Sequence, residues 1–386
     1  MAMDADTFQQ LLDTIRRFVE ERLIPLEHQV ANDDVVPKDL KREMSEMGLF
    51  GLTIPEEYGG IGVNMEEEVR LCMELGRTSP AFRSVFGTSI GIGSQGILMD
   101  GTEEQKREYL PKIAAGDCVA SFALTEPEAG SDAAHLKTTA IRNGEQYIFN
   151  GTKRYITNAP TADILTVMAR TNPEIDGARG VSSFIVERGT PGLSFGKPEQ
   201  KMGQQGAHIC DVIFDNCHVP AKNLIGGVEG VGFKTAMKVL DRGRLHLAAV
   251  CVGHAQRALE EALAYACERK QFGQAIAEFQ LVQAMLANTK TEIYAARCMT
   301  IDAAKKRDAG KNVSTEAACA KMFASEMCGR AVDNAVQIFG GSGYIADHGI
   351  ERMYRDARLY RIYEGTTQIQ QVIIARNMIH EWRENL

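Results

Sequence analysis

The spacing of apolar residues changes twice along the chain and divides it into three regions. Near the start, apolar side chains recur every three or four positions on one helical face, with charged residues opposite. These residues are Phe8, Leu11, Leu12, Ile15, Phe18, Val19 and Leu23. They predict a packed helix and not a signal peptide. Turn residues at Pro37, 55–60, Gly101 and Pro111 separate further helical segments, so residues 1–120 are expected to form a helical domain.

From about residue 117 the pattern changes to short apolar runs separated by turn residues. The runs are CVASFAL, QYIFNG, ILTVMAR, VSSFIVE and DVIFD, with Asn143-Gly144 and Asp176-Gly177 between some of them. Several strands without intervening helices predict an antiparallel sheet or barrel over residues 121–228.

After Gly226, Gly227 and Gly230 the helical period returns and continues to the end of the chain. Helices are predicted at 232–268, 280–309, 314–340 and 366–382. Long helices with short connections indicate a bundle over residues 229–386. The order of helical layer, sheet and bundle predicts an α+β fold, without the alternating strands and helices of a Rossmann fold.

Composition and charge narrow the class of protein. The chain is 44% hydrophobic and 24% charged, and no segment approaches the roughly 20 apolar residues that span a bilayer. A net charge of -8 argues against nucleic acid as a partner, although it does not exclude phosphate groups bound locally. The cysteines and histidines are dispersed, with no Cys-x-x-Cys, so no metal site is expected. The odd number of scattered cysteines indicates a reducing compartment, the cytoplasm, or the mitochondrial matrix if a transit peptide precedes the chain.

Three loops carry candidate chemistry. Residues 125–132 (TEPEAGSD) follow a strand, and their small residues would let backbone N–H groups approach a phosphate or ring system; a polar turn is the alternative. Residues 337–343 (QIFGGSG) place three glycines after a helix, which is also typical of a helix C-terminus. Residues 363–370 (YEGTTQIQ) place Glu364 before a helix that Thr366 can cap, where a carboxylate also favours the helix dipole.

Together these loops resemble the acyl-CoA dehydrogenase family over essentially the whole chain. The matching segments are LTEPEAGSD at 124–132, NGTKRYITN at 150–158, DRGR at 241–244, ERKQFG at 268–273, QIFGGSGY at 337–344 and YEGTTQIQ at 363–370. The resemblance implies a helical N-terminal domain, a central antiparallel β domain and a C-terminal four-helix bundle. It also implies a homotetrameric flavoprotein with one non-covalent FAD per subunit.

Site residues follow from the same resemblance, position by position. Flavin and pyrophosphate contacts are implied for Phe122, Leu124, Thr125, Gly130, Ser131, Tyr155, Ile156 and Thr157, and adenine-side contacts for Thr366 and Gln368. A neighbouring subunit is expected to reach the cofactor through Arg269, Gln271, Phe272, Gln280, Gln337, Gly340 and Gly341. Substrate contacts are implied for Ser131, Asp241, Arg244, Gly365 and Arg376. For Arg244 and Arg376 the alternative is a salt bridge within the bundle.

The implied reaction is α,β-dehydrogenation of an acyl-CoA to the trans-2-enoyl-CoA. Such a reaction needs a base for the α proton and an acceptor for the β hydride. The resemblance assigns the base to Glu364 and the hydride to flavin N5, with electrons passing on to an electron-transfer flavoprotein. Some members carry the base on the preceding helix instead, but that position is Gly243 here.

Arg83 raises the possibility of an anionic substrate. AFRS at 81–84 resembles the segment in which glutaryl-CoA dehydrogenase carries an arginine for the distal carboxylate of its substrate. A buried arginine there would favour a dicarboxylic or other anionic acyl group, or elimination chemistry on one. The match is partial, because a serine that assists in that enzyme falls at Gly87, and Arg83 binding a helix end or a surface acid is the alternative.

The sequence also allows two other functions, and three residues differ from the family pattern. The same fold can act as an oxidase that passes electrons to oxygen, or persist as a helical scaffold without catalysis. Tyr155 stands where many family members have Trp, and Glu128 replaces a frequent Gly, adding negative charge near the expected phosphates unless it points outward. His254 interrupts an apolar helical segment and is interpreted as partly exposed or hydrogen-bonded, and not catalytic.

Overall fold

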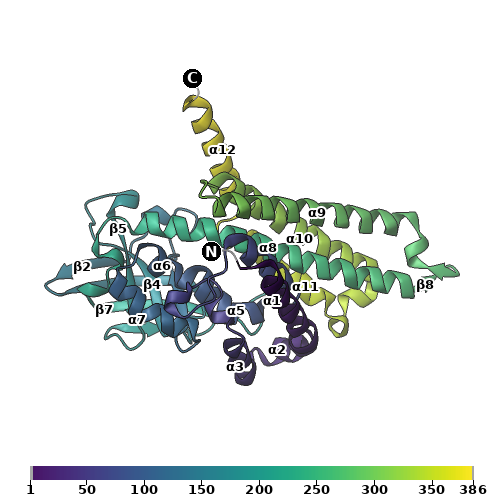
Figure 1. Ribbon diagram of the computed structural model, residues 1–386, viewed down its shortest axis with the longest axis horizontal. Helices are drawn as coiled ribbons and strands as arrows, with labels where there is room; N and C mark the ends of the chain where they lie inside the picture. The colour runs from purple at the N-terminus through teal and green to yellow at the C-terminus, as the bar shows by residue number, and fades with distance from the viewer. Residues whose placement is uncertain (1–2, 385–386) are drawn as a thin grey trace.

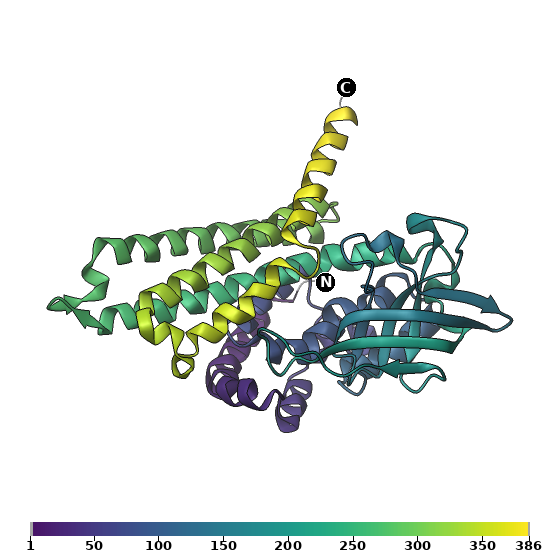
Figure 2. The ribbon, with the colours of Figure 1, turned by 180° about the vertical axis from the view of Figure 1, so that it is seen from behind.

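The structure, a computed structural model, describes residues 3–384 and consists of three parts (Figures 1 and 2). A β-sheet lies at one end of the molecule, a bundle of long helices lies at the other, and the N-terminal helices pack beside both (Figure 1). Helix α8, Gly232–Glu268, runs through the whole length and joins sheet and bundle. The predicted α+β fold of helical layer, central sheet and C-terminal helices is therefore confirmed.

The N-terminal part consists of helices joined by short turns. They are α1 (Ala5–Phe18), α2 (Glu27–Asp33), α3 (Lys38–Glu46), α4 (Met65–Leu75), α5 (Pro80–Thr88), α6 (Gln95–Asp100) and α7 (Glu103–Ala114). The apolar face predicted for the first helix is buried at Ile15, Phe18, Val19 and Leu23, the last two lying in a π-helical turn that continues α1. This face anchors the N-terminal core.

One expected break in this part is absent. Pro111 was predicted to separate helices, but it lies inside α7. Pro111 is exposed, so water can satisfy the carbonyl group that loses its N–H partner, and the helix continues. A capping box formed by Thr102 and Gln105 fixes the start of the same helix.

The central sheet is mixed, which corrects the expectation of a purely antiparallel one. Its strands are β1 (Ala120–Ala123), β2 (Thr139–Asn143), β3 (Gln146–Thr157), β4 (Ile164–Arg170), β5 (Val181–Glu187), β6 (Leu193–Phe195) and β7 (Ile209–Pro220), in the order β1-β4-β2-β3-β7-β6, with β5 also on β4. β4 pairs in parallel with β1 and β2, and the other pairs are antiparallel. Because β3 runs back along β2, the chain has regained its first direction when it enters β4.

Helix α8 packs closely on this sheet. All residues of β4 are buried, and so are those of β5 except Glu187. A Cβ added to Gly232, at the start of α8, would lie 2.2 Å from the carbonyl carbon of Ser182 in β5. Only glycine permits this approach, so the long helix is fixed against the sheet at its first residue.

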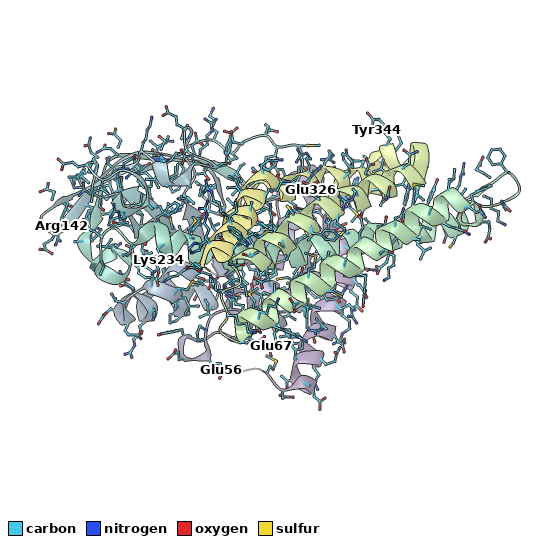
Figure 3. The ribbon with its side chains drawn as sticks, turned by 90° about the horizontal axis from the view of Figure 1, so that it is seen from above. Glu56, Glu67, Arg142, Lys234, Glu326 and Tyr344 are labelled. Carbon is cyan, nitrogen blue, oxygen red and sulfur yellow. The ribbon has the colours of Figure 1, made fainter. Side chains whose placement is uncertain are left out.

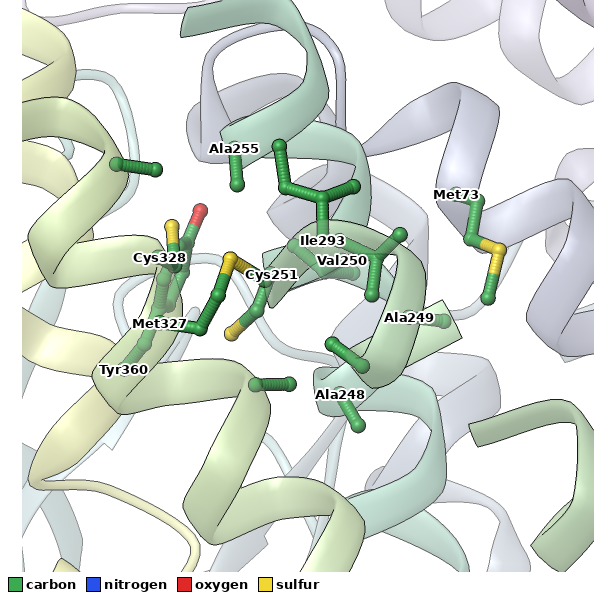
Figure 4. Packing of buried hydrophobic residues seen from close by; sticks show 14 of the residues in the cluster. Met73, Ala248, Ala249, Val250, Cys251, Ala255, Ile293, Met327, Cys328 and Tyr360 are labelled. Carbon is green, nitrogen blue, oxygen red and sulfur yellow. The ribbon is translucent and has the colours of Figure 1, made fainter. Parts of the chain in front are cut away.

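The C-terminal part is helical throughout. After α8 come a small hairpin of β8 (Lys270–Gln271) and β9 (Gln274–Ala275), then α9 (Gln280–Asp308), α10 (Ser314–Phe339), α11 (Ile350–Ala357) and α12 (Thr367–Glu384). Small side chains let α8 and α10 pack closely around Cys251, Met327 and Cys328 (Figure 4). None of the helices between residues 3 and 384 is long and apolar enough to cross a bilayer.

The last helix differs from the expected bundle member. α12 is hydrogen-bonded to α10 at Thr367 and Asn377, and its end projects away from the body (Figures 1 and 2). The shorter α11, which the sequence did not predict, lies instead against α8 and α10. Its segment IERMYRDA is short and rich in charge, but Ile350, Met353 and Ala357 recur at helical spacing and are buried, so a local signal for this helix was present.

His254 is buried where α8 meets α11. Its exposed fraction is 1%, its Nε2 lies 3.1 Å from the Met353 carbonyl oxygen, and its ring packs edge-on against Tyr360. Burial lowers the pKa of His254 to about 4. The expected hydrogen-bonded histidine is therefore present, in a fully buried form.

We expect His254 to make folding stability depend on acid pH. The folded protein excludes a proton that the unfolded chain binds below about pH 6.5. The free energy of unfolding should fall between about pH 6.5 and pH 4 by about 3 kcal/mol from this residue. Urea unfolding of the wild type and of His254→Gln across this range measures it, and the variant should show a shallower slope. Equal slopes would contradict the assignment.

Candidate active site

One cavity of about 550 Å³ lies where the sheet, α5, α8 and the start of α12 meet. Its walls come from the 122–134 segment, the end of β3, the first half of α8 and the 363–365 loop. A hollow of about 560 Å³ also lies between α1 and α9, but charged groups such as Arg77 and Glu260 already pair across it. The first cavity contains the predicted chemistry and is the candidate site.

The backbone fixes Glu364 at the cavity wall. Glu364 has φ +54°, in the left-handed region that costs a non-glycine residue free energy. The Gln370 side chain donates to the carbonyl oxygens of Glu364 and Gly365, at 3.1 and 3.0 Å, and Lys321 Nζ donates to Gly365 at 2.7 Å. Thr366 caps α12 by accepting from the N–H of Ile369. The loop is therefore held from α10 and α12.

The Glu364 carboxylate is aimed into the cavity. Its Oε2 is buried and has no hydrogen-bond partner among the described residues. A Cβ added to Gly243 of α8 would lie 2.5 Å from this oxygen. Glycine at position 243 therefore makes room for the carboxylate, and a proton acceptor free of other partners faces the cavity.

A buried ion pair supports the 124–132 loop. Lys153 in β3 is fully buried and donates to Leu124 O at 3.1 Å and to Glu126 Oε1 at 2.6 Å. Glu126 also accepts from the backbone N–H of Lys137 and Thr138. Burial lowers the pKa of Lys153 to about 8 although Glu126 opposes the shift. The pair leaves the other residues of the loop free to face the cavity.

The same loop has the character of a cofactor cradle. Gly130 faces open space, since an added Cβ would meet no atom within 4 Å. Phe122 and Leu124 offer apolar surface, and Thr125 and Ser131 offer hydroxyl and backbone groups beside it. Such a wall fits a planar ring with polar edges and a phosphate, as a flavin nucleotide has. Glu128 pairs with Lys137 in solvent, so its charge is compensated.

The structure separates the predicted site residues into two groups. The cavity is lined by Glu364, Phe122, Leu124, Thr125, Gly130, Ser131, Tyr155, Ile156, Thr157, Arg244, Gly365, Arg376 and Arg83. The residues expected to come from a neighbouring subunit do not line it, and neither do Asp241, Thr366 and Gln368. Tyr344, which follows the glycines at 340–341, lies on the part of the bundle away from the sheet (Figure 3).

Two arginines at the cavity have different surroundings. Arg244 is buried and forms an ion pair with Asp241 one turn earlier on α8, while its Nε has no hydrogen-bond partner among the described residues. The salt-bridge alternative thus describes Arg244 only in part, because the same side chain lines the cavity. Arg376 is exposed on α12 at the cavity wall.

Arg83 lines the cavity from α5 and contacts His246, which in turn contacts Glu68; the sequence did not predict either contact. Its Nη1 lies 2.9 Å from Nε2 of His246, and His246 Nδ1 lies 2.8 Å from Glu68. His246 also lines the cavity. The sequence did contain one indication of a buried polar group, because Glu68 falls on the apolar face of α4 one turn before Cys72.

Glu68, Cys72 and His246 also form a group with metal-ligand chemistry, their ligand atoms lying within 4.8 Å of one another. This group could not be predicted from the sequence, because His246 is far along the chain from Glu68 and Cys72. Glu68 already pairs with Arg242, and Arg83 contacts the imidazole, so two guanidinium groups stand beside any cation placed here. This arrangement favours an internal hydrogen-bond network over a metal site.

Comparisons with known proteins show which family models and relatives this chain is similar to. Family models match the chain in succession: acyl-CoA dehydrogenase, N-terminal domain at residues 5–117, middle domain at 121–217 and C-terminal domain at 230–379. The caffeyl-CoA reductase-Etf complex subunit CarC of Acetobacterium woodii is 42% identical over 361 residues, which cover 93% of this chain and 95% of the relative.

Two solved structures share the fold closely. Butyryl-CoA dehydrogenase from Megasphaera elsdenii has a TM-score of 0.94 and 36% identity, and the match covers 98% of this chain and 100% of that chain. Glutaryl-coenzyme A dehydrogenase in complex with glutaryl-CoA has a TM-score of 0.93 and 33% identity, with 98% and 96% covered.

Proposed function

Because this chain belongs to the acyl-CoA dehydrogenase family, whose members are FAD-dependent flavoproteins, we propose that it oxidises the Cα–Cβ bond of an acyl-CoA with Glu364 as the base. The observation that carries the proposal is the Glu364 carboxylate, which faces the cavity with a buried oxygen free of hydrogen bonds. Gly243 opposite leaves room for it. The product is the trans-2-enoyl-CoA.

We assign removal of the α proton to the Glu364 carboxylate, which lines the cavity. The hydrogen bonds from Gln370 fix the backbone of Glu364 at the cavity wall. A thioester that enters with its α carbon toward the carboxylate is therefore oriented for proton transfer. The acyl chain excludes water from the carboxylate when it fills the apolar cavity. FAD, when bound, supplies the acceptor for the β hydride.

FAD would be held by the cavity-lining residues of the 122–131 loop and by Tyr155, Ile156 and Thr157 at the end of β3. Arg244 and Arg376 are proposed to bind the CoA part, with Ser131 and Gly365 beside it, because their donors stand at the cavity wall and CoA is anionic. Asp241 acts indirectly, by pairing with Arg244.

A homotetramer would complete the cofactor site. The seven residues assigned to the neighbouring contact lie at the outer end of the bundle or beside it, and Phe272 there is 92% exposed. The projecting helix α12 exposes Met378, Ile379 and Trp382 as well. Apolar side chains in such positions fit burial against other copies of the chain. We further propose an electron-transfer flavoprotein as acceptor, in line with the Etf complex of the relative CarC.

The test of the base is anaerobic bleaching of the flavin absorbance by a panel of acyl-CoAs. Wild-type holoenzyme should bleach with at least one straight-chain, branched or dicarboxylic thioester. Glu364→Gln keeps the shape of the side chain but removes the proton acceptor, so the rate should fall by at least about 1,000-fold.

Each other outcome has a definite meaning. Unchanged bleaching in Glu364→Gln would contradict the assignment of the base. Absence of bleaching with every thioester would contradict dehydrogenation itself and revive the non-catalytic scaffold. Oxygen consumption in step with turnover would identify an oxidase in place of a dehydrogenase that uses an electron-transfer flavoprotein.

A second candidate is the same reaction, or an elimination, on an anionic acyl-CoA. It is favoured by Arg83, which lines the cavity with Glu364 and forms no ion pair with a carboxylate among the described residues. Its Nε is buried without a partner. A Cβ added to Gly87 would lie 3.2 Å from Arg83 Nη1, so position 87 is beside the guanidinium and its lack of a side chain leaves room there.

Arg83→Gln tests this candidate. The substitution removes a buried charge that would pair with a distal carboxylate, so kcat/KM for glutaryl-CoA should fall by about 100-fold. The value for butyryl-CoA, which has no distal charge, should fall much less. Equal losses for both thioesters in steady-state assays would mean that Arg83 supports the fold and does not select the substrate.

A further inference from the structure

A chain of buried polar side chains lies behind the cavity wall at Arg83. Arg83 Nη1 contacts His246 Nε2 at 2.9 Å, His246 Nδ1 contacts Glu68 Oε1 at 2.8 Å, and Arg242 pairs with both oxygens of Glu68. Each of these side chains is at most 9% exposed. They come from α4, α5 and α8, so three helices set their positions.

These contacts determine where the imidazole proton lies. A guanidinium only donates, so Nε2 of His246 must accept from Arg83, and Nδ1 carries the hydrogen that Glu68 accepts. His246 is then neutral. Cys72, also beside the ring, stays a neutral thiol because burial raises its pKa well above the ordinary value.

The charges within this group do not balance. Arg83 and Arg242 are both cationic, and Glu68 is the one carboxylate hydrogen-bonded within the group. Glu364 lines the same cavity as Arg83, but no hydrogen bond or ion pair joins the two side chains among the described residues. A buried cation without an anionic contact is costly, which points to an anion that the cavity receives.

We infer that His246 is a positioning residue that holds Arg83 in place to bind the terminal carboxylate of an acyl-CoA. This inference rests on the second candidate of the proposed function. One guanidinium nitrogen is fixed by the imidazole, and the rest of the group remains available at the cavity wall. Glu68 fixes the ring in turn, and Arg242 fixes Glu68, so the orientation is set before the substrate arrives.

A purely structural role for His246 predicts a different effect of its substitution on acyl-CoA binding than a positioning role does. If the histidine merely filled space between α4 and α8, its loss would weaken binding of all acyl-CoAs alike. A positioning role changes the preference between two thioesters that differ in the terminal carboxylate. Glutaryl-CoA and butyryl-CoA form such a pair, and their affinity ratio is the quantity to measure.

The affinities of glutaryl-CoA and butyryl-CoA are measured by isothermal titration calorimetry. The holoenzyme carries Glu364→Gln, so that neither thioester is consumed. In this background His246→Leu should lower the ratio of glutaryl-CoA to butyryl-CoA affinity by at least about tenfold. His246→Gln, whose amide can accept from Arg83 and donate to Glu68, should restore the ratio to within about threefold of the parent. His254→Gln, a buried histidine two turns along α8 and outside the cavity, is the matched control and should leave the ratio unchanged.

The results separate this inference from the proposed function. A ratio that His246→Leu leaves unchanged, or a parent with no preference for glutaryl-CoA, would overturn the role of His246. Dehydrogenation itself is judged independently, by flavin bleaching with enzyme that retains Glu364. If His246→Leu does not fold, His246→Asn provides the same comparison, because its side chain is too short to contact both Glu68 and Arg83.

Discussion

The contact between Glu364 and Gly243 is the constraint on which the site depends. It brings the loop before α12 against the first half of α8, with 2.5 Å between the carboxylate oxygen and the place where a Cβ at position 243 would stand. α8 is itself fixed to the sheet at Gly232 and continues into the bundle. One long helix therefore aligns the proposed base with the 124–132 loop, which follows strand β1 of the sheet and is proposed to hold the cofactor.

Two buried charged groups take different parts in this arrangement. Lys153 and Glu126 satisfy each other and hold the 124–132 loop, so their role is to shape the wall. Arg83 has an imidazole as its hydrogen-bonded partner and faces the cavity. A buried charge without an oppositely charged partner is costly. We therefore interpret the Lys153–Glu126 pair as support for the loop, and Arg83 as a candidate for binding an anionic substrate group.

Much of the fold could be predicted from the sequence, because local periods report it directly. The runs of β4 and β5 and the limits of α8 correspond closely to the predicted segments. The parallel pairings of β4 depend on the path of the chain, and the departure of α12 from the bundle depends on tertiary contacts, so neither has a local signal. Glu364 was found through its motif, whereas Glu68 and His246 meet from distant segments and only the structure brings them together.

The most direct test of the account is proton exchange at the α carbon, separated from hydride transfer. An acyl-CoA without β hydrogens, such as 3,3-dimethylbutyryl-CoA, is incubated with holoenzyme in D2O, and deuterium at Cα is followed by mass spectrometry. The account predicts enzyme-dependent exchange with the wild type and none above the uncatalysed rate with Glu364→Gln. Equal exchange by both proteins would mean that another group removes the proton and that the contact between Glu364 and Gly243 does not position the base.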